Sequence, residues 1–180
     1  MSVYLRPFEL DDFKLINKWR NDQELHKLTG NMHAFISGDT ERNWVAEKMK
    51  FNAGEIYVAI CLNGTNEMVG YCCLTEINNI YRTCTMRSIV IGSDAGKGKN
   101  AAFTALSELF EYAFNSLNMH RISASYFQQH EKSARLFAKL GFKVEAVLRK
   151  SWFKSGSYHN EVVVGLLRED FEAMKAKAIH

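Results

Sequence analysis

The sequence predicts an α/β fold in which a mixed sheet of about seven strands carries helices on both faces. Apolar runs of strand length alternate with amphipathic runs of helix length along the chain of 180 residues. The pair Asn63-Gly64 separates two of the strand-length runs, and this dipeptide is typical of a tight hairpin. Between residues 85 and 126 a strand, a long helical run and another strand follow one another, which predicts a right-handed parallel crossover.

The N-terminal half of the chain is expected to form four strands and two helices. The strands cover residues 3–7, 56–62, 68–77 and 82–91. The first helix begins after Asp11 or Asp12, either of which can cap it, and ends near Asn21-Asp22. A polar loop over residues 30–38 precedes a second helix, for which Thr40 is the expected N-cap. Both helices should turn apolar side chains toward the core: Phe13, Ile16, Trp19, Trp44, Val45 and Met49.

The C-terminal half is expected to contain two longer helices and three more strands. Apolar residues recur at helical spacing over residues 100–117 and again over 130–140, where Gly141 ends the second helix. A strand over residues 121–126 lies between these helices. Strands over residues 143–153 and 158–167 flank a Ser155-Gly156 turn, and a short amphipathic helix closes the chain.

Composition limits the class of protein. With one proline and 47% hydrophobic residues, we expect residues 1–180 to form one domain with a sizeable core. The first ten residues lack the pattern of a signal peptide, and no apolar run approaches the roughly 20 residues of a membrane helix, so we expect a cytoplasmic protein with no membrane partner. A net charge of +3 is too diffuse to indicate nucleic-acid binding, but it is compatible with a phosphate-rich ligand in one pocket.

The four cysteines predict neither a metal site nor a disulfide framework. Cys61, Cys72, Cys73 and Cys84 all fall in apolar strand-like runs, without the Cys/His spacing of a zinc site. We therefore expect reduced thiols in the core and no metal cofactor.

The segment from Ile89 to Ala101 is the candidate anion site. A hydrophobic strand, Ile89-Val90-Ile91, runs through Gly96-Lys97-Gly98 into a helix. Glycines let a backbone approach a bulky anion, and the free N–H groups of the following helix point at it. Binding of a diphosphate is the functional interpretation; an ordinary strand-to-helix turn is the alternative.

A second set of motifs carries a family resemblance. Leu117-Asn118-Met119-His120-Arg121-Ile122 is followed by Ser133-Ala134-Arg135-Leu136-Phe137-Ala138-Lys139-Leu140-Gly141-Phe142. In this order the motifs resemble the GNAT superfamily of N-acetyltransferases, in the branch with ribosomal-protein, spermidine and nucleotide-amino-sugar acetyltransferases. The resemblance covers essentially the whole chain and is strongest from residue 69 to 167. It implies a GNAT fold with a V-shaped opening between the strands 85–91 and 121–126.

The resemblance implies that acetyl-CoA, as co-substrate, enters this opening. Backbone N–H groups of Ile89 to Ile91 would polarise the acetyl carbonyl and stabilise the oxyanion, and Gly96 to Ala101 would hold the diphosphate. Lys132 and Arg135 either reach CoA phosphates or are solvated surface. The cofactor-binding residues expected on this basis are Ile89, Val90, Ile91, Ala95, Gly96, Lys97, Gly98, Lys99, Asn100, Ala101, His130, Lys132, Ser133 and Arg135.

The chain departs from the family pattern at four positions. Ala95 and Asn100 stand at two ends of the usual pyrophosphate signature, and His130 replaces the usual Asn. Phe137 replaces a tyrosine that is proposed to protonate the departing CoA thiolate in many relatives, and a phenylalanine has no proton to donate. Tyr126 and His130 are the substitutes available by residue type, and packing or capping roles are the alternative for both. Slow catalysis without a general acid is a third possibility, since a thiolate leaves readily.

The acceptor side is less defined. Glu76 matches a glutamate of spermidine-acetyltransferase relatives and is a candidate base or amine-binding carboxylate; otherwise it is an exposed strand-end acid. Trp19 and Arg20 resemble the opening of nucleotide-amino-sugar acetyltransferases, where the first helices wall the acceptor site, although core and surface roles explain them as well. Tyr158, with His26, His33 and His159, is a further candidate for the acceptor pocket.

The sequence thus predicts an acetyl-CoA-dependent N-acetyltransferase that transfers directly in a ternary complex, because no nucleophile for an acetyl-enzyme is evident. Its acceptor is a primary amine of an amino sugar on a nucleotide sugar or of a protein N-terminus, with a polyamine such as spermidine as the alternative. Mild basicity favours an anionic acceptor. A noncatalytic acyl-CoA-binding sensor is the competing hypothesis. The acceptor and the oligomeric state stay open, with a homodimer as one option.

Overall fold

The computed structural model describes residues 2–28, 35–98 and 100–178. Its described residues form one mixed sheet of seven strands in the order β1-β2-β3-β4-β5-β7-β6. The strands are β1 (Val3–Pro7), β2 (Ile56–Leu62), β3 (Met68–Asn78), β4 (Thr83–Ile91), β5 (Arg121–Phe127), β6 (Lys143–Lys154) and β7 (Ser157–Leu167). The predicted α/β class and the mixed sheet are confirmed.

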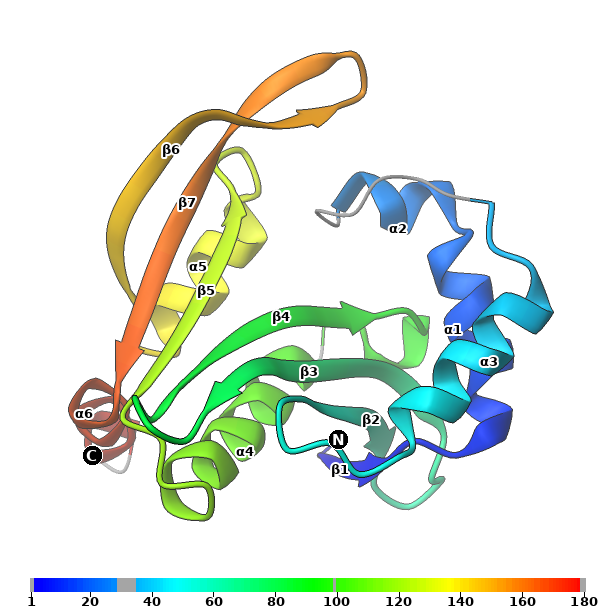
Figure 1. Ribbon diagram of the computed structural model, residues 1–180, viewed down its shortest axis with the longest axis horizontal. Helices are drawn as coiled ribbons and strands as arrows, with labels where there is room; N and C mark the ends of the chain where they lie inside the picture. Colours follow the sequence, from blue (N-terminus) through cyan, green and yellow to red (C-terminus); the bar gives the residue numbers. More distant parts are fainter. Residues whose placement is uncertain (1, 29–34, 99, 179–180) are drawn as a thin grey trace.

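Helices cover both faces of the sheet, as Figure 1 shows. The short helices α1 (Phe13–Arg20) and α3 (Gly38–Lys48) lie on one face, with α2 (Gln23–Leu28) beyond them. The helices α4 (Ala101–Asn115), α5 (Glu131–Lys139) and α6 (Arg168–Ala178) lie on the other. Two 3-10 turns, η1 (Leu10–Asp12) and η2 (Asp94–Gly96), precede α1 and α4.

Each helix layer closes its own hydrophobic core. The larger core joins α4, α5 and α6 to strand residues that include Ile60, Cys72 and Ile122. The smaller core joins α1 and α3 to the opposite face of β2 and β3 through Ile16, Trp19, Val45 and Tyr71, among others. Because side chains alternate along a strand, the same strands supply both cores.

Strands β4 and β5 begin as a parallel pair and then separate. Their ladder joins only Thr83, Cys84 and Thr85 to Arg121, Ile122 and Ser123. Beyond Thr85, β4 has a strand partner only on its β3 side, while β5 continues antiparallel to β7 as far as Phe127. The V-shaped opening expected between these two strands is present (Figure 1).

A β-bulge in β4 changes which way its side chains point. Leu74 of β3 is opposite Met86 and Cys73 is opposite Ser88, so Arg87 is the extra residue. An extra residue reverses the alternation of side chains. Cys84 and Met86 therefore belong to the larger core before the bulge, and Ile89 and Ile91 pack against it after the bulge.

Several local expectations were wrong. The second helix starts at Gly38, and its N-cap is Ser37 and not Thr40. The Ser37 hydroxyl accepts a hydrogen bond from the backbone N–H of Thr40, which lies in the first turn of the helix. Met49 is exposed just after this helix instead of in the core. Asp12 is the N-cap residue of α1, as expected, but its side chain makes no capping hydrogen bond, since its carboxylate accepts from the Glu9 N–H and pairs with Arg6. Helix α2 was not expected, and the predicted loop over residues 30–38 lies partly outside the described residues.

The expectation for the cysteines agrees with the structure. Cys61, Cys72, Cys73 and Cys84 are free thiols in the buried core. No helix in the described part of the chain is long and apolar enough to cross a membrane.

Candidate active site

Two cavities flank the point where β4 and β5 separate. The first, which we call the strand cavity, has a volume of about 500 Å³ and lies between the two strands. The second, which we call the helix cavity, has a volume of about 570 Å³ and lies at the N-terminus of α4 beside α5. Ile89, Val90, His130 and Ser133 line both cavities, so the two spaces meet at these residues. We call these four residues the junction.

The helix cavity has the charge of an anion site. Among the lining residues that the structure describes there is no carboxylate. Four lining side chains are cationic: Lys97, Lys132, Arg135 and Lys139. The first turn of α4 contributes Ala101, Ala102 and Phe103, where a helix has unpaired N–H groups and the positive end of its dipole. Phosphate groups suit this combination of backbone donors and cations.

The loop that enters α4 depends on residues that adopt unusual backbone angles. Gly98 has φ +72°, and Asn100, the N-cap of α4, is left-handed at φ 56°. Gly92, at the end of β4, lies against the buried ring of Trp19, where a Cβ atom would come within 2.2 Å of that ring. The close contact explains why a glycine is needed where the strand turns toward the loop.

His130 is the titratable side chain of the junction. Its Nδ1 lies 2.6 Å from the Ser133 hydroxyl, which fixes the ring at the start of α5. Burial lowers the pKa of His130 below its ordinary value of 6.5, and the charges of Lys132 and Lys154 act in the same direction. The imidazole is therefore neutral at pH 7 and suited to accept a proton.

Phe137 and Tyr126 form a stacked pair on the wall of the strand cavity. Phe137 is 3% exposed, and its ring lies 5.6 Å from that of Tyr126 with an interplanar angle of 27°. Both residues line the strand cavity. The Tyr126 phenol thus stacks directly on Phe137, the residue that occupies the position of the usual tyrosine in the motif.

Comparison with known proteins identifies the family. The sequence pattern of the acetyltransferase (GNAT) domain matches residues 2–143. The chain belongs to the GNAT acetyltransferase family. The protein is accordingly an N-acetyltransferase that uses acetyl-CoA as the acetyl donor, which decides against the noncatalytic sensor.

Individual relatives are more distant. The chain is similar to the spermidine N(1)-acetyltransferase of Escherichia coli K12, with 26% identity over 174 residues that cover 96% of this chain and 89% of the relative. It is 23% identical to the ribosomal protein uS5-alanine N-acetyltransferase of the same organism, over 77% of this chain and 71% of the relative. The crystal structure of spermidine N-acetyltransferase from Vibrio cholerae in complex with CoA and spermine has the same fold, with a TM-score of 0.85, 23% identity and coverage of 95% and 98%.

Most residues predicted to bind acetyl-CoA are brought together in the GNAT enzyme. Twelve of them line the helix cavity: Ile89, Val90, Ile91, Gly96, Lys97, Gly98, Asn100, Ala101, His130, Lys132, Ser133 and Arg135. Ala95 packs against the larger core instead, and Lys99 lies outside the described residues. The cations and helix N–H groups of this cavity fit the phosphates of CoA, whose thioester would reach the junction.

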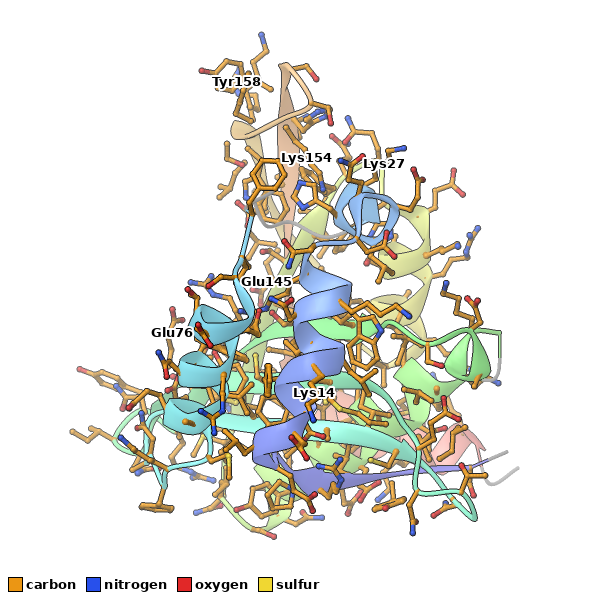
Figure 2. All side chains as sticks on the ribbon, turned by 90° about the vertical axis from the view of Figure 1, so that its right-hand side faces the viewer. Lys14, Lys27, Glu76, Glu145, Lys154 and Tyr158 are labelled. Atoms are coloured by element: carbon orange, nitrogen blue, oxygen red, sulfur yellow. The ribbon has the colours of Figure 1, made fainter. Side chains whose placement is uncertain are left out.

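Glu76 lies outside both cavities. It has a left-handed backbone at φ 54°, accepts a hydrogen bond of 2.7 Å from the Thr85 hydroxyl, and is 3.7 Å from Arg87. It borders a separate surface depression with Asn52, Glu55 and others. Figure 2 shows it far below the tip of the β6–β7 hairpin. Its predicted role as base or amine-binding carboxylate stays a prediction.

Trp19 and Arg20 of α1 line neither cavity. Both contact neighbouring side chains of the protein instead. Trp19 is buried and stacks on Tyr71. Arg20 pairs with Glu41 at 3.0 Å and lies 3.9 Å above the Trp44 ring. Glu41 is 0% exposed, and its burial raises its pKa while Arg20 opposes that rise. This buried pair ties α1 to α3.

Tyr158 lies at the outer end of the β6–β7 hairpin, as Figure 2 shows. Its ring is exposed and packs on Phe153, and it lines neither cavity. His159 stands beside it in the same strand and contacts the ring of Phe127.

Several residues that line the cavities were not predicted from the sequence. Glu161 and Trp152 line the strand cavity, and Leu25, Leu136 and Lys139 line the helix cavity. The periodicity of α5 could have shown that Arg135, Leu136 and Lys139 share a helix with His130. Nothing local to Glu161 or Trp152 indicates that β7 lies next to β5 or that β6 lies beyond β7.

Proposed function

We propose that this N-acetyltransferase transfers the acetyl group to a primary amine of a polyamine, in a ternary complex with acetyl-CoA. The observation that carries the proposal is the junction, where a phosphate-binding cavity meets a second cavity that opens between β4 and β5. CoA in the helix cavity would present its acetyl thioester there, and the amine would approach through the strand cavity. Direct transfer needs both substrates to meet at one point.

Proton transfer follows from the groups around the junction. The amine nitrogen attacks the acetyl carbonyl, and the backbone N–H groups of Ile89 and Ile91, which point away from β3 and have no strand partner on the β5 side, stabilise the oxyanion. Neutral His130 accepts the proton that the nitrogen loses, directly or through a water. As the C–S bond breaks, the CoA thiolate takes a proton from the Tyr126 hydroxyl, which is later returned from His130 or solvent.

Charge in the strand cavity favours a cationic acceptor over a nucleotide sugar. The only permanently cationic side chain of its described lining is Arg87, which is exposed and already faces Glu76. The diphosphate of a nucleotide sugar calls for several cations or helix N–H groups, which the helix cavity has and the strand cavity lacks. Similarity to spermidine acetyltransferases supports the same choice. The sequence-based preference for an anionic acceptor is therefore reversed in this proposal.

Strands and helices after residue 143 complete the same sheet and supply Trp152 and Glu161 to the strand cavity. We therefore propose that residues 1–180 act as one acetyltransferase domain.

An acceptor panel tests the proposed function. Purified protein is incubated with acetyl-CoA and, separately, with spermidine, glucosamine, a nucleotide-linked amino sugar and a peptide with a free N-terminus, and release of free thiol is followed. We expect the highest kcat/KM with spermidine. A higher kcat/KM with the nucleotide-linked amino sugar or the peptide would reject the polyamine as acceptor, while turnover with none of them would reject all three classes.

A further inference from the structure

Glu161 is a carboxylate on the acceptor side of the strand cavity. It lies on β7 directly opposite Phe127 of β5, and Val163 lies opposite Ser125. Directly opposed residues of an antiparallel pair point to the same face. The alternate residues Ala124, Val162 and Val164 belong to the larger core on the side of α4, α5 and α6. Glu161 therefore points to the face away from the helix cavity.

The surroundings of Glu161 leave its negative charge available. The Ser151 hydroxyl donates a hydrogen bond of 3.3 Å to this carboxylate, and no ion pair joins it to a cation within the described ranges. It is the only acidic residue in the described lining of the strand cavity. An unpaired carboxylate in a cavity wall attracts a positively charged ligand.

Aromatic rings lie beside this carboxylate. Phe127 and Trp152 pack edge to face with ring centres 4.3 Å apart, and both line the strand cavity with Glu161. The Lys154 ammonium already lies over the Phe127 ring, 4.8 Å from its centre, so the part of the two rings offered to a ligand is their apolar surface, which accommodates the methylene chain between two amines. The wall thus combines one negative charge with apolar surface, which matches an alkyl chain that ends in a cation.

We infer that Glu161 binds a second ammonium group of the acceptor and so selects diamines and polyamines over monoamines. This inference rests on the proposed function and deepens it. Glu161 is not one of the junction residues, so it holds the acceptor by its distant end while the amine to be acetylated reaches His130. A monoamine of the same length lacks the group that Glu161 would bind, and it loses that interaction in the ground state and in the transition state alike.

The test compares putrescine with n-pentylamine, which have similar length but two charges and one. In the native protein we expect kcat/KM to be about 10- to 100-fold higher for putrescine, the range of one charge-assisted hydrogen bond. Glu161→Gln keeps the shape and should remove most of that ratio through KM, while Glu161→Asp should keep part of it. Glu172→Gln, an exposed carboxylate of α6, is the matched control and should leave the ratio unchanged.

Calorimetry separates the inference from the proposed function. Spermidine is titrated into the CoA-loaded protein, and we expect Glu161→Gln to weaken binding about 10-fold or more while binding of CoA is unchanged. If spermidine binds both proteins equally, or if the variant lowers kcat/KM equally for both amines, the inference is overturned. Loss of CoA binding or a lower thermal midpoint in Glu161→Gln would likewise assign Glu161 a structural role and overturn it. Absence of turnover together with Glu161-dependent spermidine binding would reject only the proposed function.

Discussion

The Nζ of Lys154, at the end of β6, donates a hydrogen bond of 2.6 Å to the main-chain carbonyl of His26 in α2. It also lies 3.3 Å from the carbonyl oxygen of Lys27, and Figure 2 shows Lys154 and Lys27 next to each other at this contact. The last carbonyls of a helix are unpaired and form the negative end of its dipole, so a lysine is a fitting partner. The contact ties the tip of the β6–β7 hairpin to α2, across the opening between β4 and β5.

We predict that Lys154→Met loosens this contact and weakens acceptor binding. KM for the amine should rise about 3- to 10-fold. A hydrogen bond to a charged group contributes roughly 1.5–3 kcal/mol, and only part of this free energy affects binding of the acceptor. KM for acetyl-CoA should not change, and amide exchange in α2 should become faster. Lys27→Met is the control, since among the residues that the structure describes the Lys27 side chain pairs only with exposed Glu24, and its carbonyl is kept. Unchanged exchange in α2 would show that the contact does not hold the helix.

We predict that the Tyr126 hydroxyl replaces the missing hydroxyl at position 137. Tyr126→Phe should lower kcat about 10- to 100-fold, which is less than general acid catalysis typically contributes, because a thiolate leaves without full protonation. In that background Phe137→Tyr should restore much of kcat, since Phe137 already lines the strand cavity and stacks on residue 126. Steady-state kinetics of the native protein and these two variants measures this. An unchanged kcat in Tyr126→Phe would contradict the assignment.

Protonation of His130 should cause the loss of the acetylation rate at acidic pH. Because its pKa lies below 6.5, the neutral base persists at pH 6.5 and is lost only at lower pH. The rate ratio of native protein to His130→Gln should therefore be constant near neutrality and fall as pH drops below 6.5. A ratio that falls already above pH 6.5 would contradict a lowered pKa.

The same shift affects stability. The unfolded chain binds the proton of His130 more readily than the folded protein does, so the free energy of unfolding should rise with pH from the lowered pKa up to 6.5. His130→Gln should lose that rise. Urea unfolding at several pH values between about 5 and 7 measures the difference.

Gly92 should be intolerant of any side chain. The Cβ of Gly92→Ala would meet the buried Trp19 ring at 2.2 Å, an overpacking that costs about 1–3 kcal/mol and shifts the loop toward α4. Affinity for CoA should fall with stability. Gly38→Ala is the control, because its Cβ meets Phe13 only at 3.9 Å, and it should be neutral or slightly stabilising. Equal urea midpoints for the two variants would show that Trp19 moves aside at no cost.

Local patterns predicted most of the elements and the donor side of the site. The helix from Ala101 to Asn115 and the strands around it follow from periodicity, and the glycine loop before that helix follows from backbone chemistry. All of these residues are near one another in sequence. The residues from Ile89 to Ala101 could therefore be proposed for acetyl-CoA binding from the sequence alone, and most of them line the helix cavity.

The capping of α3 shows where local reasoning fails. Ser37 and Thr40 are both common caps, and their hydroxyls lie 2.9 Å apart, so residue type did not identify the first helical residue. Backbone conformation decides it: Ser37 is extended at ψ 155°, and the helix starts at Gly38.

The sequence by itself determined the fold class and the family, and it predicted the segment that we propose to receive acetyl-CoA, because each depends on short-range periodicity or on contiguous motifs. Only the tertiary structure decided the acceptor side. Strand order places β7 between β5 and β6, which brings Glu161 and Trp152 beside Phe127 and leaves Glu76 and Tyr158 outside both cavities. The physical reason is that side chains from distant parts of the chain become neighbours only through strand pairing and register, which single-strand patterns do not encode.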